Sequence, residues 1–216
     1  MRTATITLLA LLLAGTAMAQ TKPIMLGFKG GVDYASLVFD PENGVDTDPS
    51  IGLAAGGLLG FMISPGMSLD TDVLYIQKGA KRNDLVPTKA DDASEVTFRY
   101  SYIVINPMLR FAVQNQGLRP YFLAGVEIGF LVDAKTESNV EEFDGQDLKD
   151  QTKSTDFGVN LGAGLEFPSG TSALFIEGRY ALGLTDITDT SDDDEIVEDQ
   201  VEVKHRGIYA LAGIRF

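Results

Sequence analysis

The chain has 216 residues, which is enough for one domain, and it contains no cysteine, which excludes disulfide frameworks, thiolate metal sites and cysteine nucleophiles. Lys and Arg number 17 against 31 Asp and Glu, so the formal net charge is −14. Such an acidic surface repels phosphate backbones, and we expect no nucleic acid partner.

The N-terminus has the three parts of a secretory signal peptide. Arg2 supplies the positive charge, residues 8–14 form a short apolar stretch, and Ala17-Met18-Ala19 fits the small-residue cleavage rule. The alternative, a membrane anchor, is disfavoured because the apolar stretch is too short to span a bilayer. We therefore predict a cleaved signal peptide over residues 1–19 and one domain over residues 20–216. Removing Arg2 leaves sixteen basic against thirty-one acidic side chains, a net charge of −15.

The mature chain is dominated by an alternation of apolar and polar residues, which is the period of a β-strand. Residues 157–167 are typical, since Phe157, Val159 and Leu161 alternate with Gly158 and Asn160. The same pattern predicts eight strands, over residues 26–34, 51–63, 67–79, 96–112, 121–133, 157–167, 174–184 and 203–216.

Two of these segments are irregular. In residues 67–79, Leu74 and Ile76 interrupt an otherwise polar face that carries Ser68, Asp70 and Asp72. Residues 96–112 begin with Phe98, Tyr100 and Tyr102 on the apolar face and end with Ile105, Leu109 and Phe111 there, which is a change of phase. Because proline cannot donate to a strand ladder, we expect a β-bulge near Asn106-Pro107.

The connections alternate between short and long. Tight-turn sequences stand at Ser64-Pro65-Gly66 and Pro168-Ser169-Gly170, and a short polar stretch surrounds residues 115–117. Short turns at one end, long loops at the other and an even strand count are the arrangement of an outer-membrane barrel. The long, mostly acidic connections lie near residues 39–50, 81–95, 135–154 and 186–202.

Alternation does not by itself say which face points outward. A soluble, lipocalin-like barrel would present its polar face to water, but here that face mixes charge with glycine, which suits a narrow lumen where opposite charges pair. The apolar face then contacts lipid, and the sheet must close on itself to leave no unpaired backbone groups. The predicted lumen residues are Lys29, Asp33, Asp70, Asp72, Arg110, Glu127, Glu166, Glu177, Arg179 and Arg215.

Aromatic residues on the apolar face are candidates for the girdles at the two membrane interfaces. The alternative is that they reflect strand propensity alone. The candidates are Phe28, Tyr100, Tyr102, Phe130 and Tyr180.

The last strand ends on an aromatic carboxy-terminal residue. Ile208, Ala210, Ala212, Ile214 and Phe216 share one face. This ending is similar to the C-terminal signal of bacterial outer-membrane barrels, which the barrel assembly machinery reads.

Several segments together resemble the PorT-like, outer-membrane β-barrel domain family of diderm (Gram-negative) bacteria. The resemblance covers the mature chain and implies a barrel in the outer membrane; its motifs build the fold and carry no catalytic residues. It does not transfer a secretion role. The segments are Gly27–Gly31, Leu74–Gly79, Tyr102–Pro107, Arg119–Gly125 and Phe175–Tyr180.

Three features could carry chemistry. His205, the single histidine, could belong to a Ser-His-acid triad, but we favour an incidental position near the barrel mouth. Glu127, Glu166, Glu177 and Arg179 could supply paired carboxylates for acid–base catalysis, but we favour a lumen salt-bridge network.

The third feature is the acidic loop 186–202, which could bind Ca²⁺ or bridge to lipopolysaccharide through divalent ions. It lacks the spacing of an EF-hand, and we favour a solvated loop.

We therefore predict an eight-stranded antiparallel up-and-down transmembrane β-barrel with both termini on the periplasmic side. We expect a non-enzymatic structural or surface-interaction protein with no catalytic, cofactor-binding or metal-binding residues and no cofactor. A small-solute channel, a barrel enzyme acting on outer-membrane lipid and a soluble ligand-binding barrel are the alternatives. The expected partners are outer-membrane lipid, lipopolysaccharide and, during biogenesis, the assembly machinery, with the chain a monomer.

Overall fold

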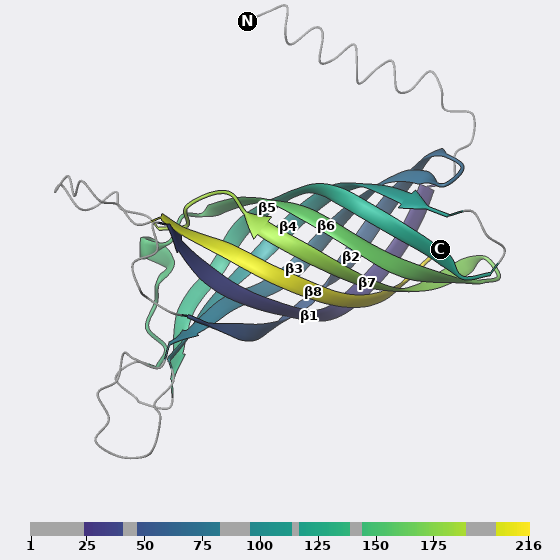
Figure 1. Ribbon diagram of the computed structural model, residues 1–216. Coiled ribbons are helices and arrows are strands. Elements are labelled where there is room, and N and C mark those ends of the chain that lie inside the picture. The colour runs from purple at the N-terminus through teal and green to yellow at the C-terminus, as the bar shows by residue number, and fades with distance from the viewer. Residues whose placement is uncertain (1–23, 41–46, 83–95, 114–116, 139–143, 189–201) are drawn as a thin grey trace, which may run out of the picture.

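The computed structural model describes residues 24–40, 47–82, 96–113, 117–138, 144–188 and 202–216, and its strands form one closed antiparallel barrel (Figure 1). Each strand pairs with the next, and β8 pairs with β1, which confirms the predicted fold. The predicted signal peptide lies outside the described residues. Among the described residues, no helix is long and apolar enough to cross a membrane. The strands are β1 (Ile24–Asp40), β2 (Asp48–Ser64), β3 (Met67–Arg82), β4 (Val96–Ala112), β5 (Arg119–Ser138), β6 (Thr155–Ser169), β7 (Ser172–Gly183) and β8 (Glu202–Arg215).

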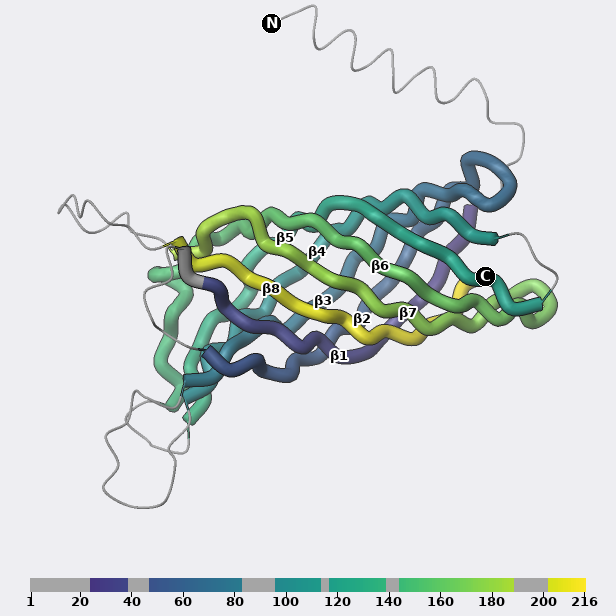
Figure 2. The backbone as a smooth tube through the Cα atoms, in the orientation of Figure 1, coloured from purple at the N-terminus to yellow at the C-terminus, as the bar shows by residue number. Residues whose placement is uncertain are grey.

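The two ends of the barrel differ, as the trace in Figure 2 shows. One end, here called the turn end, carries the β2–β3 and β6–β7 turns and the C-terminus. Gly66 and Gly170 have φ values of 84° and 63° there, a left-handed conformation that glycine adopts without strain. The opposite end, called the loop end, carries the longer connections, including the 3₁₀ turn η2 (Lys149–Gln151). Parts of these predicted loops lie outside the described residues, namely 41–46, 83–95, 139–143 and 189–201.

The strands are longer at the loop end than the alternation predicts. β1 continues to Asp40 and β5 to Ser138, because residues beyond the apolar pattern still pair with β8 and β4. The predicted connections over residues 39–50 and 135–154 therefore begin inside strands. Polar strand ends suit a position outside the apolar layer of a membrane.

The apolar and charged faces point where the alternation predicts. Large apolar side chains are exposed on the outside of the barrel, for example Phe28 at 66% and Phe122 at 64%. All ten predicted lumen residues, from Lys29 to Arg215, are buried inside it. An outer surface of this composition is stable in hydrocarbon and not in water, which identifies the outer face as the lipid contact.

The phase predicted for the first half of β4 is wrong. β4 pairs with β3 in one continuous register, and its irregularity against β5 lies at Ser101/Tyr102 instead of Asn106-Pro107. Tyr100 and Tyr102 consequently point into the lumen and are 8% and 0% exposed, so they are not girdle residues. The apolar character of Tyr100 and Tyr102 indicated the wrong face because aromatic side chains also fill the lumen near the loop end.

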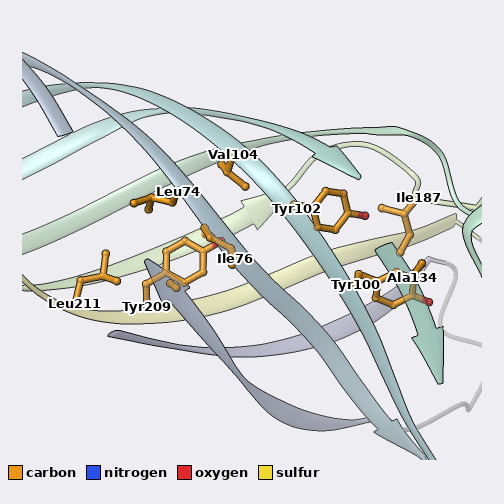
Figure 3. Packing of buried hydrophobic residues seen from close by; sticks show 11 residues of the cluster. Leu74, Ile76, Tyr100, Tyr102, Val104, Ala134, Ile187, Tyr209 and Leu211 are labelled. Carbon is orange, nitrogen blue, oxygen red and sulfur yellow. The ribbon is translucent and has the colours of Figure 1, made fainter. Parts of the chain in front are cut away.

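Leu74 and Ile76 of β3 have the same explanation. They keep the phase of Asp70 and Asp72, point inward and are buried. Figure 3 shows them inside the barrel with Val104 and Tyr209, packed in the largest apolar cluster. The lumen is therefore a filled core with both apolar and charged layers, as expected for eight strands.

Candidate functional site

The charged lumen residues form three clusters stacked along the barrel. The turn-end cluster consists of Asp70, Arg110, Glu166 and Arg215. An Arg110 Nη2–Glu166 Oε2 contact of 2.7 Å and an Arg215 Nη2–Asp70 Oδ2 contact of 2.6 Å join these residues in pairs. Arg110 also lies 4.0 Å over the ring of Tyr121, a cation–π contact. Among the buried residues the two acids and two bases balance, and the partly exposed Arg119 adds a contact to Glu166, with an Nη1–Oε1 distance of 3.5 Å.

The middle cluster consists of Lys29, Asp72, Glu177 and Arg179. Lys29 Nζ lies 2.9 Å from Asp72 Oδ2 and 3.2 Å from Glu177 Oε1. Arg179 binds both acids, with an Nη2–Glu177 Oε1 distance of 2.5 Å. The Tyr121 hydroxyl donates to Glu177 Oε2 at 2.8 Å. This cluster is also balanced, and it joins strands that are not neighbours in the sheet.

The upper cluster, nearest the loop end, consists of Asp33, Lys78, Glu127 and Asp156. Lys78 Nζ lies 2.6 Å from Glu127 Oε1 and 2.9 Å from Asp156 Oδ2. Three acids therefore share one base. The second oxygen of Glu127 also accepts hydrogen bonds from two buried amides, Asn106 Nδ2 at 3.1 Å and Asn160 Nδ2 at 2.8 Å, and from the Tyr209 hydroxyl at 3.3 Å.

His205 does not assemble a catalytic triad. Its Nε2 lies 3.4 Å from the Tyr102 hydroxyl, and its ring makes edge contacts with Tyr100 and Tyr102. Its Nδ1 has no hydrogen-bond partner, and within the described residues no serine or threonine hydroxyl bonds to the imidazole. A triad requires a nucleophile and an acid bonded to the two ring nitrogens.

The predicted carboxylates Glu127, Glu166 and Glu177 lie in different clusters, and each is bonded to a lysine or an arginine. The preferred prediction, a salt-bridge network that includes Arg179, is confirmed. The predicted lumen residues did not include five members of the network, although the alternation already placed Asn160 on the polar face. Each keeps the period-two phase of the lumen residues on its own strand, which is the signal that would have found them: Lys78, Asn106, Asp156, Asn160 and Tyr209.

The predicted acidic loop is described only at its edges. Asp186 anchors it: its Oδ1 accepts hydrogen bonds from the Val203 and Thr188 amides at 2.9 and 3.1 Å, and Oδ2 lies 3.0 Å from Lys153 Nζ. Partial burial opposes the charged form, but these donors outweigh it and hold the pKa of the Asp186 carboxyl below its ordinary value. In the described part of the chain, no group of three or more His, Asp or Glu side chains is placed to hold a metal ion.

A small hollow lies at the loop end. Its volume is about 240 Å³, and its walls include the apolar side chains of Leu37, Phe98, Tyr100, Leu148 and Ile187. On the side toward the turn end, the upper cluster occupies the lumen, so the hollow does not continue through the barrel.

A family model agrees with this fold. The model of the family described as outer membrane protein beta-barrel domain matches residues 18–189. The chain belongs to this family. It is thus an outer-membrane protein. No curated protein matches the chain in sequence.

Solved structures of other bacterial barrels resemble the chain in architecture. Neisserial surface protein A is 13% identical, with 88% of this chain and 95% of that chain covered and a TM-score of 0.49. OprG of Pseudomonas aeruginosa is 12% identical over 90% and 97%, with a TM-score of 0.47. Ail of Yersinia pestis, in complex with a heparin analogue, is 17% identical over 89% and 99%, with a TM-score of 0.41. At these identities the likeness describes the fold alone.

Proposed function

We propose that this barrel has a non-enzymatic, structural or surface-interaction role in the outer membrane, and that its lumen conducts no solute. The observation that carries the proposal is the filled lumen. Contacts cross it between strands that are not neighbours: Arg179 of β7 to Asp72 of β3, Lys78 of β3 to Glu127 of β5, and Arg110 of β4 to Glu166 of β6. A diffusion path along the axis would have to break all three clusters.

The chemistry of the lumen supports a non-enzymatic role. Its carboxylates are held by cations and amides, and a carboxylate engaged in this way is a poor general base. His205 is 3% exposed and bonds to a tyrosine hydroxyl in place of a nucleophile. Lipid substrates would approach from the outer face, where the side chains are apolar.

The proposed partners follow from the surfaces. The exposed apolar band contacts outer-membrane lipid, and the acidic loop end faces outward, where it meets lipopolysaccharide and any partner at the cell surface. The strand ladder closes within one chain, so no second copy is needed to pair an edge, which supports a monomer. During biogenesis, the chain would be inserted by the barrel assembly machinery.

We also assign the chain to the PorT-like part of its family. The assignment rests on the segments named above, such as Gly27–Gly31 and Phe175–Tyr180. In the barrel these segments place Lys29, Glu177 and Arg179 in the middle cluster. These segments thus contribute to the packing of the lumen, and we propose no secretion role from them.

Proteoliposomes test the proposal. Purified barrel is inserted into vesicles of bacterial outer-membrane lipid that enclose a small fluorescent solute. We expect the solute to remain inside and the lipid composition, followed by mass spectrometry, to stay unchanged. Release of the solute would establish the channel alternative, and a new lipid product that requires His205 would establish the enzyme alternative.

A further inference from the structure

The three lumen clusters differ in charge balance. The turn-end and middle clusters each contain two buried acids and two buried bases, whereas the upper cluster contains three buried acids and one buried base, with His205 beside them. Two negative charges are therefore left over in the upper cluster. One is shared by Glu127 and Asp156, which bind Lys78 and accept further hydrogen bonds from buried amides and a hydroxyl, and the other lies on Asp33. A charge without a partner in a buried site costs several kcal/mol, so a folded barrel needs a means of compensating it.

Asp33 is the acid that lacks a partner. It is 0% exposed, and neither carboxylate oxygen has a hydrogen-bond partner. Lys78, the base of this cluster, bonds to Glu127 and Asp156 instead. The Tyr209 hydroxyl, on the residue paired with Asp33 in the β1–β8 ladder, also donates to Glu127.

A small enclosed space adjoins this carboxylate. Asp33, Lys78, Glu127, His205 and Tyr209 line a cavity of about 10 Å³. That is room for one particle the size of a water molecule. The Nδ1 atom of His205, which is 3% exposed, is a second polar atom in its lining without a partner. The space is thus bordered by two unpartnered polar side chains and by an excess of negative charge.

We propose that the upper cluster is a binding site for one small monovalent cation, held at the Asp33 carboxylate. A proton and a sodium-sized ion share this chemistry, because either one neutralises the carboxylate within the available space. A multivalent metal, which needs several charged ligands at once, is a poorer fit, because the described acid and histidine side chains, those of this cluster included, form no group of three or more placed to hold a metal ion. Binding couples to folding because the cavity exists only in the closed barrel.

The response of the site to pH and to salt depends on the groups that surround Asp33. The charged and titratable groups around Asp33 are Lys78 of β3, Tyr102 of β4, Glu127 of β5, Asp156 of β6, and His205 and Tyr209 of β8; Arg206 of β8, an exposed residue, also borders the cavity. If the cation is a proton, the folded barrel binds more protons than the unfolded chain, and stability falls as pH rises. If it is sodium, stability rises with the logarithm of the sodium concentration once the site approaches saturation.

The melting temperature of the full barrel in detergent tests the site. Wild-type protein is compared in sodium chloride and in choline chloride of equal ionic strength, each at mildly acidic and at alkaline pH. A higher melting temperature in sodium than in choline at alkaline pH identifies a sodium-class ion. A higher melting temperature at acidic pH, the same in both salts, identifies a proton. No response to either variable overturns the proposal.

Variants assign the response to Asp33. Asp33→Asn, which neutralises the carboxyl without a change of size, should abolish the response and raise the melting temperature at alkaline pH in choline. The matched control is Asp72→Asn in the balanced middle cluster, which should lower stability and retain the response. A response that survives Asp33→Asn, or that disappears in His205→Gln but not in Asp33→Asn, would contradict the assignment.

Discussion

Arg179 and Glu177 lie two residues apart on β7, and both side chains enter the lumen, where Nη2 of the arginine is 2.5 Å from Oε1 of the glutamate. The guanidinium also binds Asp72 on β3, and Lys29 on β1 binds both acids. Four buried charges from three strands therefore neutralise one another. Each charge depends on the others for its compensation.

This dependence predicts a non-additive response to mutation. Arg179→Ala leaves two acids against Lys29 and should lower the free energy of unfolding by about 3–5 kcal/mol, the usual cost of a stranded buried charge. Adding Glu177→Gln restores a balanced Lys29–Asp72 pair, so the double variant should be more stable than Arg179→Ala alone. Urea unfolding in detergent micelles gives both values. A single variant as stable as wild type would contradict a paired network.

The orientation of two tyrosines predicts a difference in lipid contact. Tyr180 is 41% exposed on the outer face, whereas Tyr100 is 8% exposed in the lumen. The chain has no tryptophan, so Tyr180→Trp and Tyr100→Trp each introduce a single reporter. Brominated lipid should quench the fluorescence of Tyr180→Trp strongly and that of Tyr100→Trp weakly. Equal quenching would restore the girdle role that the sequence suggested for Tyr100.

Two glycines of the barrel wall differ in the space around them, and we expect their alanine variants to differ in stability. A Cβ atom on Gly162 would lie 2.7 Å from the carbonyl oxygen of Gly178 and 2.9 Å from Cγ of Arg179, whereas Gly178 has open space on the lipid side. Gly162→Ala should therefore lower the free energy of unfolding by about 1–3 kcal/mol through overpacking. Gly178→Ala should change it by less than about 0.5 kcal/mol, as for other uncrowded surface sites. The two unfolding curves, measured side by side, check this prediction.

The anchor of the loop end predicts a local dependence on pH. Since hydrogen bonds lower the pKa of Asp186, its contribution is complete above the ordinary pKa of an aspartate and is lost as pH falls through the lowered value. The protection factors of the Val203 and Thr188 amides, which correct for the slower intrinsic exchange in acid, should fall under those acidic conditions, while amides in the barrel wall stay protected. Asp186→Asn should show fast exchange at both amides at neutral pH. Protection of these two amides that does not change with pH in the wild-type protein would contradict the role of Asp186 as an anchor.

The sequence was sufficient to predict the closed sheet and the ten lumen residues because charge marks the inner face of a lipid-exposed strand. It misplaced Tyr100 and Tyr102 because an apolar residue can fill the lumen as well as face lipid. The sequence of β4 nonetheless indicates which face of the strand points inward, because the polar residues Asn106 and Arg110 lie on the same face as both tyrosines. Assigning the inward face of β4 from these polar residues would have placed both tyrosines in the lumen.

The sequence did not allow a prediction of which lumen side chains pair with one another. Lys78 and Glu127 are 49 residues apart, on strands separated by β4. Which lumen residues meet depends on the stagger of the closed ring, and alternation within single strands contains no information on that stagger. The imbalance around Asp33 therefore emerges only once the barrel is closed.

Single-channel recording in planar bilayers tests most directly whether the lumen is closed. Purified wild-type barrel should insert and give no discrete conductance steps, because the three clusters block the lumen between the turn end and the hollow at the loop end. Reconstituted protein is confirmed by protease protection, so that silence reflects a closed barrel and not a failed insertion. Stable, uniform conductance steps from wild-type protein would contradict a filled lumen and the function proposed from it.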